Sequence, residues 1–590
     1  MITKNITKSE FLLKNGLLLI FILIVIFRGG REVIGISIFE ISTLIFFLFW
    51  LSRAQVFPIT KITIPFLFFT FWYLISCLYS LNPIMGIIHF SAILIYFIVM
   101  HLCIDISQDD GLKRKFIELY IFISVILGLS VLIQFCFKYN LTLFPNNNLL
   151  AGFLSIGILF ITGILFIEKE KLSKKLAIYY WLSFLITVTA IFLTFSRGGL
   201  IALLSGIFVL FLYNYKKLLK AILIMFIIFL ILFIIVPQEN SAIWFAHKFL
   251  NPDAFGRIII WKTCLSGFIS RPITGWGAGS LKEAYHLFSV PVEWEIGRFS
   301  KYTRFAHNEY IDIATETGII GLALFLWFVI LTVRTIKDKI SLSVVISILI
   351  HSFFDFNLHL PAIFFTFFFI TGISIREKTY LNLGHFTKKI CYVLSVVFLL
   401  ANISLFTSQI MFNLGEKEKS KNKLKEAMKY YNLSIICNPL NFLAWQKKAN
   451  LIDNLYEAEN SFKKALFLNP NDSFINYDFA HFYIKNNKIE DAIYQYNSAI
   501  KKNPHNPFFW FELGEIYLKK NEIQKARLHY YKAVNLEPFY LFAHYRLSQL
   551  GNKYSIENIK KILNSNITPT DEYSKRLLYL PEKIKKEFMK

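Results

Sequence analysis

Side chains that could do chemistry gather in four short polar motifs between residues 190 and 370. The first motif is TFSRGG at residues 194–199, which places Arg197 in a tight turn between two apolar runs. An arginine there could bind an anion, helped by the amide groups that begin the next helix. The alternative is an arginine that reaches from an apolar surface to water. The motif alone favours neither interpretation.

The second motif is a glycine-rich stretch. Gly256-Arg257 is followed by RPITGWGAGS at residues 271–280, which begins with Arg271. Glycines permit positive φ angles and a close approach of two backbone segments. An ordinary loop turn is the alternative, and it is a strong one for any single glycine-rich run. The glycines do not follow a predicted strand, so the motif does not indicate a dinucleotide-binding site.

The third motif is HNEY at residues 307–310, followed by ETG at 316–318. His307 and Glu309 lie where a loop is expected to pass into a helix. A histidine beside a carboxylate could act as a general base. A hydrogen-bonded capping histidine is the alternative, and the motif taken alone favours that alternative.

The fourth motif is HSFFDFNLHLP at residues 351–361. His351 and Asp355 are four residues apart, so we expect them to share one face of a helix near its outer end. Ionisable side chains are costly there unless they line a wet cavity or form a hydrogen bond between helices. The outer loops hold no set of carboxylates that would complete a metal site, so we predict neither a metal nor a cofactor.

The elements that must position these motifs are membrane helices. The chain has 590 residues, of which 55% are hydrophobic and only 17% are charged, whereas soluble chains carry about 25% charged residues. The mean hydropathy is +0.51. This composition excludes a soluble enzyme and predicts a polytopic, all-α bundle of about 12–13 transmembrane helices. The predicted spans are 11–27, 33–51, 62–80, 84–104, 116–137, 149–167, 176–194, 198–213, 218–236, 318–335, 340–357, 358–375 and 389–407.

The basic residues of the short loops predict the orientation. Most of them fall on one side of the membrane when the N-terminus is placed in the cytoplasm, as the positive-inside rule requires. The long loop 237–317 and everything after residue 407 are then extracytoplasmic. The basic N-terminus lacks a small-residue cleavage site, so we expect a retained first helix. The net charge of +24 is not gathered in a stripe with interleaved aromatic residues, which argues against a nucleic-acid partner.

An internal repeat begins after residue 411. Prolines recur at 439, 470, 504 and 538, each after a small-x3-aromatic-x2-small pattern. The four sets are Ala427/Tyr431/Ser434, Ala458/Phe462/Ala465, Ala492/Tyr496/Ala499 and Ala526/Tyr530/Ala533. Period and pattern resemble the tetratricopeptide repeat, which predicts an α-solenoid of about four repeats over 411–590 with a concave binding face. One repeat is three residues short within 445–458, so we expect a tightened turn there.

The order of the four motifs, with one long outer loop between them, resembles the O-antigen ligase / O-antigen polymerase family of the Wzy-C type, in its form with a tetratricopeptide tail. The resemblance implies a GT-C-like transmembrane domain over 1–410 and a glycosyltransferase that moves a glycan from an undecaprenyl-diphosphate carrier to an acceptor. Carried over by position, it implies that Arg197, Arg257 and His307 are catalytic. The other candidate residues, expected to bind substrate, are Glu309, His351, Asp355 and Arg271.

Under this resemblance the two arginines would hold the diphosphate in place of a metal ion, and His307 would take the proton of the attacking hydroxyl. The acceptor would be lipid A-core or another surface glycan for a ligase, a growing polysaccharide for a polymerase, or a protein for an O-oligosaccharyltransferase, in that order of preference. The expected location is the bacterial cytoplasmic (inner) membrane, with the active site and the repeats in the periplasm. The repeats could bind a protein partner or the acceptor.

Two other classes of protein remain as alternatives. A transporter of lipid-linked oligosaccharide predicts ionisable residues near the midplane and two related halves, whereas the polar groups here collect at one rim. A repeat-bearing scaffold predicts that Arg197, Arg257 and His307 are dispensable.

Overall fold

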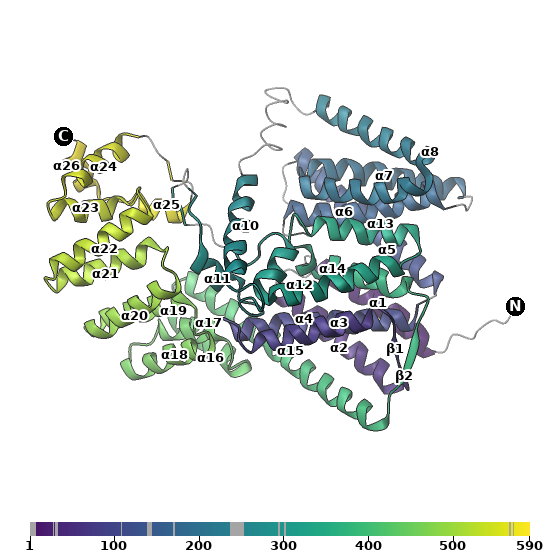
Figure 1. Cartoon of the computed structure of the whole chain (residues 1–590), viewed down its shortest axis with the longest axis horizontal. Coiled ribbons are helices and arrows are strands. Elements are labelled where there is room, and N and C mark those ends of the chain that lie inside the picture. Colours follow the sequence, from purple (N-terminus) through teal and green to yellow (C-terminus); the bar gives the residue numbers. More distant parts are fainter. Residues whose placement is uncertain are drawn as a thin grey trace. The chain divides into compact units, whose positions relative to one another are not determined.

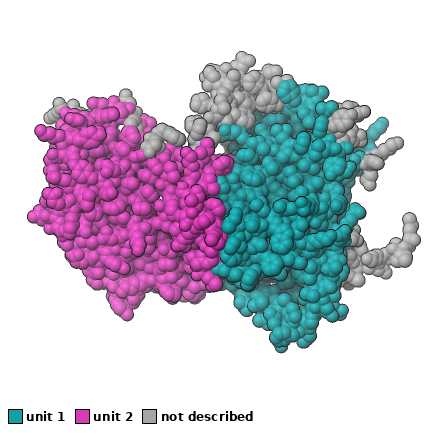
Figure 2. Space-filling model, in the orientation of Figure 1, with its two compact units in different colours: residues 1–75, 88–256, 305–410 teal, residues 76–87, 257–304, 411–590 magenta. Residues whose placement is uncertain are grey.

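The computed structural model is almost entirely helical, and it separates into two compact units (Figures 1 and 2). It describes residues 8–27, 29, 33–107, 109–137, 144, 146–168, 172–235, 253–292, 296–299, 303–565, 568–569 and 571–589. Unit 1 comprises residues 1–75, 88–256 and 305–410. Unit 2 comprises residues 76–87, 257–304 and 411–590.

Unit 1 is built from long apolar helices. Seven helices of the described residues are long and apolar enough to cross a membrane, and five shorter helices are also apolar. In chain order these helices are α1 (Lys8–Ile26), α2 (Val33–Arg53), α3 (Thr63–Cys77), α4 (Pro83–Asp105), α5 (Asp110–Phe137), α6 (Asn147–Thr162), α7 (Lys174–Leu193), α8 (Arg197–Ile235), α12 (Glu309–Thr335), α13 (Lys339–His351), α14 (Pro361–Ser374) and α15 (His385–Ser420). The predicted class, a multi-pass all-α membrane protein, is confirmed.

Two of the predicted spans fall within the bounds of one helix. The spans 198–213 and 218–236 were expected to be separate, and α8 runs from Arg197 to Ile235. Its part Arg197–Tyr213 is an apolar helix by itself, and it corresponds to the first of the two spans.

Strands are few in the described part of the chain. β1 (Val56–Ile59) pairs antiparallel with β2 (Thr379–Asn382), with Val56 opposite Asn382. This two-stranded ribbon ties the segment after α2 to the segment before α15.

Helix α6 forms the centre of unit 1. Every residue from Leu149 to Thr162 is buried, and α5, α7, α8 and α13 all contact the helix. A π-helical turn, Gly163–Ile167, follows it. Small residues allow the close contacts: a Cβ added to Gly152 would lie 2.6 Å from Nδ1 of His351. The polar end of α13 is therefore packed directly on the central helix.

Unit 2 combines residues 257–304 of the predicted outer loop with the repeats. Two helices occur among the described residues of the loop, α10 (Asp253–Ser270) and α11 (Leu281–Phe288). The repeat helices are α16 (Leu424–Cys437), α17 (Phe442–Ala449), α18 (Leu455–Leu468), α19 (Ser473–Lys485), α20 (Ile489–Lys502), α21 (Pro507–Lys519), α22 (Ile523–Leu536) and α23 (Leu541–Gln549). They are followed by α24 (Lys553–Asn564), α25 (Glu572–Leu577) and α26 (Glu582–Met589).

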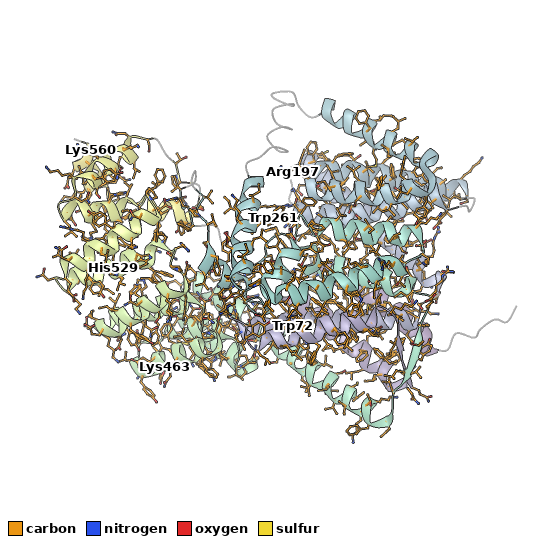
Figure 3. The ribbon with its side chains drawn as sticks, in the orientation of Figure 1. Trp72, Arg197, Trp261, Lys463, His529 and Lys560 are labelled. Carbon is orange, nitrogen blue, oxygen red and sulfur yellow. The ribbon has the colours of Figure 1, made fainter. Side chains whose placement is uncertain are left out.

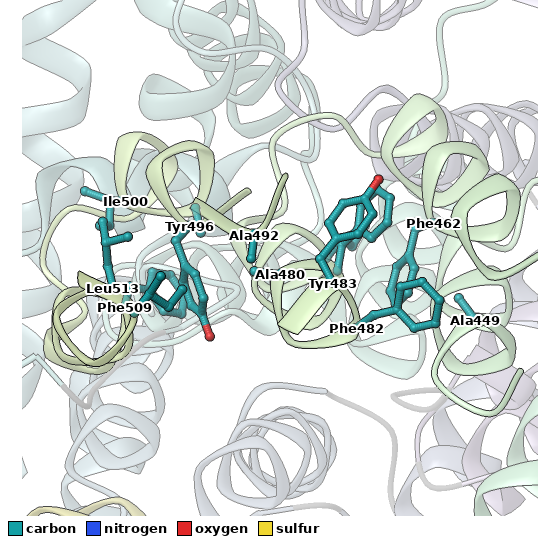
Figure 4. Packing of buried hydrophobic residues seen from close by; sticks show 14 of the residues in the cluster. Ala449, Phe462, Ala480, Phe482, Tyr483, Ala492, Tyr496, Ile500, Phe509 and Leu513 are labelled. Atoms are coloured by element: carbon teal, nitrogen blue, oxygen red, sulfur yellow. The ribbon is translucent and has the colours of Figure 1, made fainter. Parts of the chain in front are cut away.

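The repeat pattern is confirmed at its interior positions. All four aromatic residues of the pattern and their small neighbours are buried. Figure 4 shows Phe462 and Tyr496 packed among the helices of successive repeats. Gly514 follows the same logic, because a Cβ there would lie 2.7 Å from the ring of Tyr530. Small residues thus make the room that the aromatic rings fill.

The short repeat is accommodated differently from our expectation. The turn after α17 is not tightened; instead the helix itself is short. α17 has 8 residues, whereas the equivalent helices α19 and α21 have 13 each. The shorter helix still packs against the next helix. Ala449 in α17 and Ala458 in α18 both remain fully buried.

The glycine-rich stretch packs within unit 2 as a backbone contact. Gly275, Gly277 and Gly279 have φ angles of 69°, 95° and 69°. A Cβ on Gly277 would lie 2.2 Å from Cα of Ser80, and the hydroxyl of Ser80 donates to the carbonyl of Ala278 over 2.6 Å. The expected positive φ angles and close approach are therefore present, and they serve the contact with residues 76–87.

Candidate active site

His307 and Asp355 form a hydrogen-bonded pair in unit 1. His307 Nδ1 lies 3.0 Å from Asp355 Oδ1. The side chain of Asp355 is 1% exposed, whereas that of His307 is 27% exposed. A carboxylate that accepts from Nδ1 leaves Nε2 as the nitrogen able to accept a proton. Nε2 makes no hydrogen bond to any described residue, so the pair has the arrangement that a general base requires.

The backbone of His307 is held in an uncommon conformation. Its φ angle is 53°, a region that non-glycine residues rarely occupy. Contacts on both sides fix it: Asp312 accepts from the amide of Ala306 over 2.6 Å, and the side chain of Asn308 caps α12 through the amides of Tyr310 and Ile311. Such conformations persist where the surroundings over-determine them, often at functional sites.

Asp355 does not share a helix face with His351, contrary to our expectation. α13 ends at His351, and Asp355 lies beyond it in the turn that leads to the short 3-10 helix Asn357–His359. The carboxylate of Asp355 also accepts from the amide of Phe356 over 2.9 Å, an interaction typical of an aspartate outside a helix. This turn directs Asp355 to His307, while His351 stays buried between α6 and α8.

Arg197 is the first residue of α8, and it is exposed (Figure 3). The turn before it is sharp, with Phe195 at a φ angle of 54°. The hydroxyl of Ser196 accepts from the amide of Gly199 over 3.2 Å, which caps the helix. The guanidinium of Arg197 makes no hydrogen bond or ion pair with any described residue. A free arginine at a helix start is suited to an anionic ligand.

The turn that carries Arg197 packs against the turn that carries Asp355. A Cβ on Gly198 would lie 3.1 Å from Cβ of Phe354 and 3.2 Å from Nε2 of His351. Phe354 immediately precedes Asp355, the partner of His307. Three sequence motifs, at 194–199, 307–310 and 351–361, are thereby brought to one region of unit 1.

Glu309 belongs to a buried polar cluster rather than to an open surface. Its carboxylate accepts from the amide of Leu358 over 2.7 Å and lies 3.0 Å from Nδ1 of His359. The backbone amide of Glu309 donates to the carbonyl of Ser352 over 2.9 Å. These bonds join the start of α12 to the turn at 352–360 and hold His307 opposite Asp355.

Three side chains of this cluster could ligate a metal ion. Glu309, Asp312 and His359 offer one ligand atom each within 4.8 Å of one another. Their atoms already have partners: His359 and Leu358 contact Glu309, and Ala306 donates to Asp312. One carboxylate oxygen of Asp312, Oδ2, is buried and makes no hydrogen bond with the described residues. The cluster therefore fits an internal ion-pair network, with a cation site as the alternative chemistry.

Arg257 and Arg271 lie in unit 2. Arg257 is a half-buried residue of α10. Arg271 follows the end of α10, and its guanidinium carbon lies 4.0 Å from the ring centroid of Trp276, a cation–π contact. The indole of Trp276 donates to the carbonyl of Gly267 over 2.9 Å. Arg271 thus packs on its own loop.

His359, Asp312 and Glu316 are site residues that the sequence motifs did not predict. Glu316 accepts from the hydroxyl of Tyr73 over 2.9 Å. His359 lies within the fourth motif. One sequence signal could have pointed to it: Asn308, a residue type that caps helices, directly precedes Glu309 and predicts that a helix begins there. A helix that begins at Glu309 carries the carboxylates of Glu309 and Asp312 on its first turn. Buried carboxylates need a partner, and His359 is that partner for Glu309.

Comparison with known families matches two parts of the chain. Residues 182–326 match the model of the O-antigen ligase family, and residues 480–521 match that of the TPR repeat. The first match spans the motifs of Arg197, Arg257, Arg271 and His307. The sequence resemblance to this family with a repeat tail is confirmed.

Known proteins with similar sequences agree with this assignment. A protein of Rickettsia prowazekii named "Putative polysaccharide ligase RP358" is 26% identical over 294 residues, which cover 47% of this chain and 69% of that protein. A "Putative polysaccharide ligase" of Rickettsia felis is also 26% identical over 294 residues, covering 46% of this chain and 68% of its own length.

Among solved structures, a crystal structure of MamA is 22% identical, covers 25% of this chain and 92% of its own, and has a TM-score of 0.23. Yeast Tom70 is 12% identical, covers 84% of this chain and 91% of its own, and has a TM-score of 0.26. Both scores are low, so the assignment rests on the sequence matches.

Proposed function

We propose that this chain, which matches the O-antigen ligase family over residues 182–326 and carries tetratricopeptide repeats, transfers a glycan from undecaprenyl diphosphate to an acceptor hydroxyl. Its apolar helices make it a multi-pass membrane protein. The reaction proposed is a direct displacement, in which the acceptor oxygen bonds to the anomeric carbon as the bond from that carbon to the phosphate oxygen breaks.

The observation that carries the proposal is the pair of His307 with Asp355. In this reaction Nε2 of His307 takes the proton from the acceptor hydroxyl while Asp355 holds Nδ1 over 3.0 Å. Positioned proton transfer of this kind contributes about 10²- to 10⁴-fold to a rate. The partial exposure of His307 lets a substrate reach Nε2.

The leaving group, undecaprenyl diphosphate, gains negative charge as the bond breaks. Arg197 is exposed at the start of α8 with its guanidinium unpaired among the described residues, which suits charge-assisted bonds to a phosphate. We propose that Arg257 supplies a second guanidinium. His351, buried behind Gly198, would hold the turn of Arg197 in place.

We propose that this stabilisation of charge needs no metal ion. In that case Glu309, Asp312 and His359 serve as the ion-pair network that fixes the loop of His307. If the cluster instead binds a divalent cation, chelation would abolish transfer. An activity assay in EDTA separates the two roles.

The arrangement in the membrane is also a proposal. We place the N-terminus in the cytoplasm, and the site, the loop 237–317 and the repeat domain 411–590 on the outer side of the inner membrane. A surface-glycan ligase is the first choice of activity. A polymerase or a protein O-oligosaccharyltransferase would use the same chemistry with another acceptor.

A transfer assay tests the proposal. The purified protein is reconstituted with an undecaprenyl-diphosphate glycan and a cell-envelope extract in EDTA, and donor consumption is measured. We expect turnover by wild type, and losses of about 10²-fold or more for His307→Ala and for Arg257→Ala. His385→Ala and Arg334→Ala are matched controls, because both side chains are exposed and lie in other helices.

The labelled product identifies the acceptor, since a lipid A-core, a lengthened glycan and a glycosylated protein differ in size and solubility. Absence of donor turnover in wild type, or full activity of both variants, would refute the mechanism. The transporter or scaffold interpretation would then be preferred.

A further inference from the structure

Unit 2 contains a cavity of about 540 Å³ between the outer loop and the repeats. His286 and Phe299 line it from the loop side, and residues of α19, α21 and α25 line it from the repeat side. The volume lies in the range of about 300–1,000 Å³ that is typical of ligand pockets. None of the residues around His307 and Asp355 lines it.

The two walls of the cavity are held together by specific contacts. Asn503 bonds to Nδ1 of His286 over 3.2 Å, and Lys282 pairs with the buried carboxylate of Asp472 over 3.2 Å. The amide of Arg298 donates to Glu537 over 2.8 Å. The cavity is therefore a built feature of one compact unit, with His286, Ser289 and Phe299 of the ligase-like segment on one wall.

Aromatic rings supply most of the apolar lining. Phe299 stacks on His505 with ring centroids 5.0 Å apart, and Tyr477 stacks on Phe509 at 5.1 Å. Phe508 meets Tyr573 edge to face at 4.9 Å. Rings fixed in this way present flat apolar surfaces, which suit a ligand with flat apolar faces of its own.

The polar groups of the lining are mostly neutral. The side-chain oxygen of Asn506 caps α21 through the amide of Phe508, while its amide nitrogen donates to no described residue. One exception is Glu572 at the start of α25, whose carboxylate is paired with Lys575 over 2.6 Å. The side-chain amide of Asn506 can pair with a hydroxyl group, because hydroxyl groups both donate and accept.

The charged groups of the lining argue against a peptide terminus. Arg576 lies 4.0 Å from the ring centroid of Phe508 and is bonded to Tyr477 and Glu512, over 3.2 and 3.3 Å. Capture of a carboxylate would need a basic side chain that is not already paired. A neutral ligand with hydroxyl edges and C–H faces fits better, and a sugar ring has that chemistry.

We propose that this cavity is a binding site for a neutral oligosaccharide, namely a segment of the glycan that the enzyme transfers or extends. The inference rests on the proposed function, which supplies the class of substrate. It assigns the repeats a role in holding glycan through their contact with the outer loop.

Direct binding tests the inference with the full-length protein in detergent. The probes are neutral oligosaccharides released by partial acid hydrolysis of the producing cell's own surface polysaccharide, observed by saturation-transfer NMR. We expect binding by wild type and at least a fivefold weaker affinity for His505→Ala and Phe299→Ala, with Phe299→Tyr restoring it. Phe467→Ala is the matched control, because this ring is 76% exposed on α18 and lies outside the cavity.

Each outcome bears on the inference separately from the reaction. No binding by wild type, affinities unchanged in both cavity variants, or displacement of the sugars by peptides alone would overturn it. His307→Ala should bind the oligosaccharides like wild type while losing transfer. Transfer without sugar binding refutes only the cavity, whereas sugar binding without transfer by wild type refutes only the proposed reaction.

Discussion

Asp355 accepts a hydrogen bond from Nδ1 of His307 over 3.0 Å, across 48 residues of sequence. The carboxylate comes from the turn after α13, and the imidazole comes from the loop before α12. Because Asp355 is buried and His307 is partly exposed, the pair presents one imidazole nitrogen outward. Asp355 is a positioning residue in this arrangement, and His307 is the residue that would contact the substrate.

Replacement of Asp355 by asparagine should reduce the turnover number roughly 10²- to 10⁴-fold with little change in KM, because the amide can donate to Nδ1 and fix the wrong tautomer. Steady-state transfer kinetics with a fixed donor measure both constants. Asp355→Glu should recover part of the turnover, whereas a merely structural role would show no such recovery. Equal kcat in Asp355→Asn and wild type would contradict the assignment.

Replacement of Arg197 by lysine should lower kcat/KM for the lipid-linked donor by about 10- to 100-fold, since one bidentate, charge-assisted contact is lost. The folded state should keep its stability, because the side chain is exposed. Transfer rates at several donor concentrations check the kinetics, with Arg334→Lys as the control. An Arg197→Lys enzyme with wild-type kcat/KM would show that this side chain only reaches toward water.

Replacement of Gly277 by alanine should destabilise unit 2 by at least about 2 kcal/mol, from backbone strain and overpacking together. Its φ angle is 95°, and the new Cβ would lie 2.2 Å from Cα of Ser80. Gly551→Ala separates the two causes, because its φ angle is 84° but nothing lies within 4 Å. Thermal unfolding in detergent should rank the midpoints as wild type, then Gly551→Ala, then Gly277→Ala.

Acid should destabilise unit 2 through His286. Burial, with a smaller contribution from the charge of Lys282, lowers the pKa of His286 from 6.5 to about 4. Below pH 6.5 the unfolded chain binds the proton more readily than the folded chain, so the stability conferred by the neutral ring is lost as the pH falls toward 4. The loss should be on the order of 3 kcal/mol.

The measurement for His286 is the unfolding midpoint between pH 7.5 and pH 4, compared with His286→Gln. Glutamine can still accept from the amide of Asn503, which lies 3.2 Å from Nδ1 of His286, but it does not titrate. The variant should therefore lose less stability over this range. Identical pH profiles would show that other groups cause the acid sensitivity.

Much of the fold could be predicted because its signals are local. Apolar runs of membrane-spanning length and the repeat pattern are properties of contiguous residues, and the buried Tyr431, Phe462, Tyr496 and Tyr530 confirm the pattern. The error in the short repeat is also local in origin. The tightened turn expected within 445–458 depended on helix ends, where many sequences are compatible with either conformation.

The sequence by itself determined the class of protein, the repeats and the residue types of the site, because hydrophobic length, periodicity and a family's motif order can be observed along one chain. It could not determine which of these residues meet. Only the tertiary structure decided that Asp355 contacts His307 and that Glu309 pairs with His359. It also decided that the turn of Arg197 packs on His351 through Gly198. The physical reason is that such contacts depend on how distant helix ends pack, and packing is fixed by the shapes of many residues together rather than by the spacing of a few.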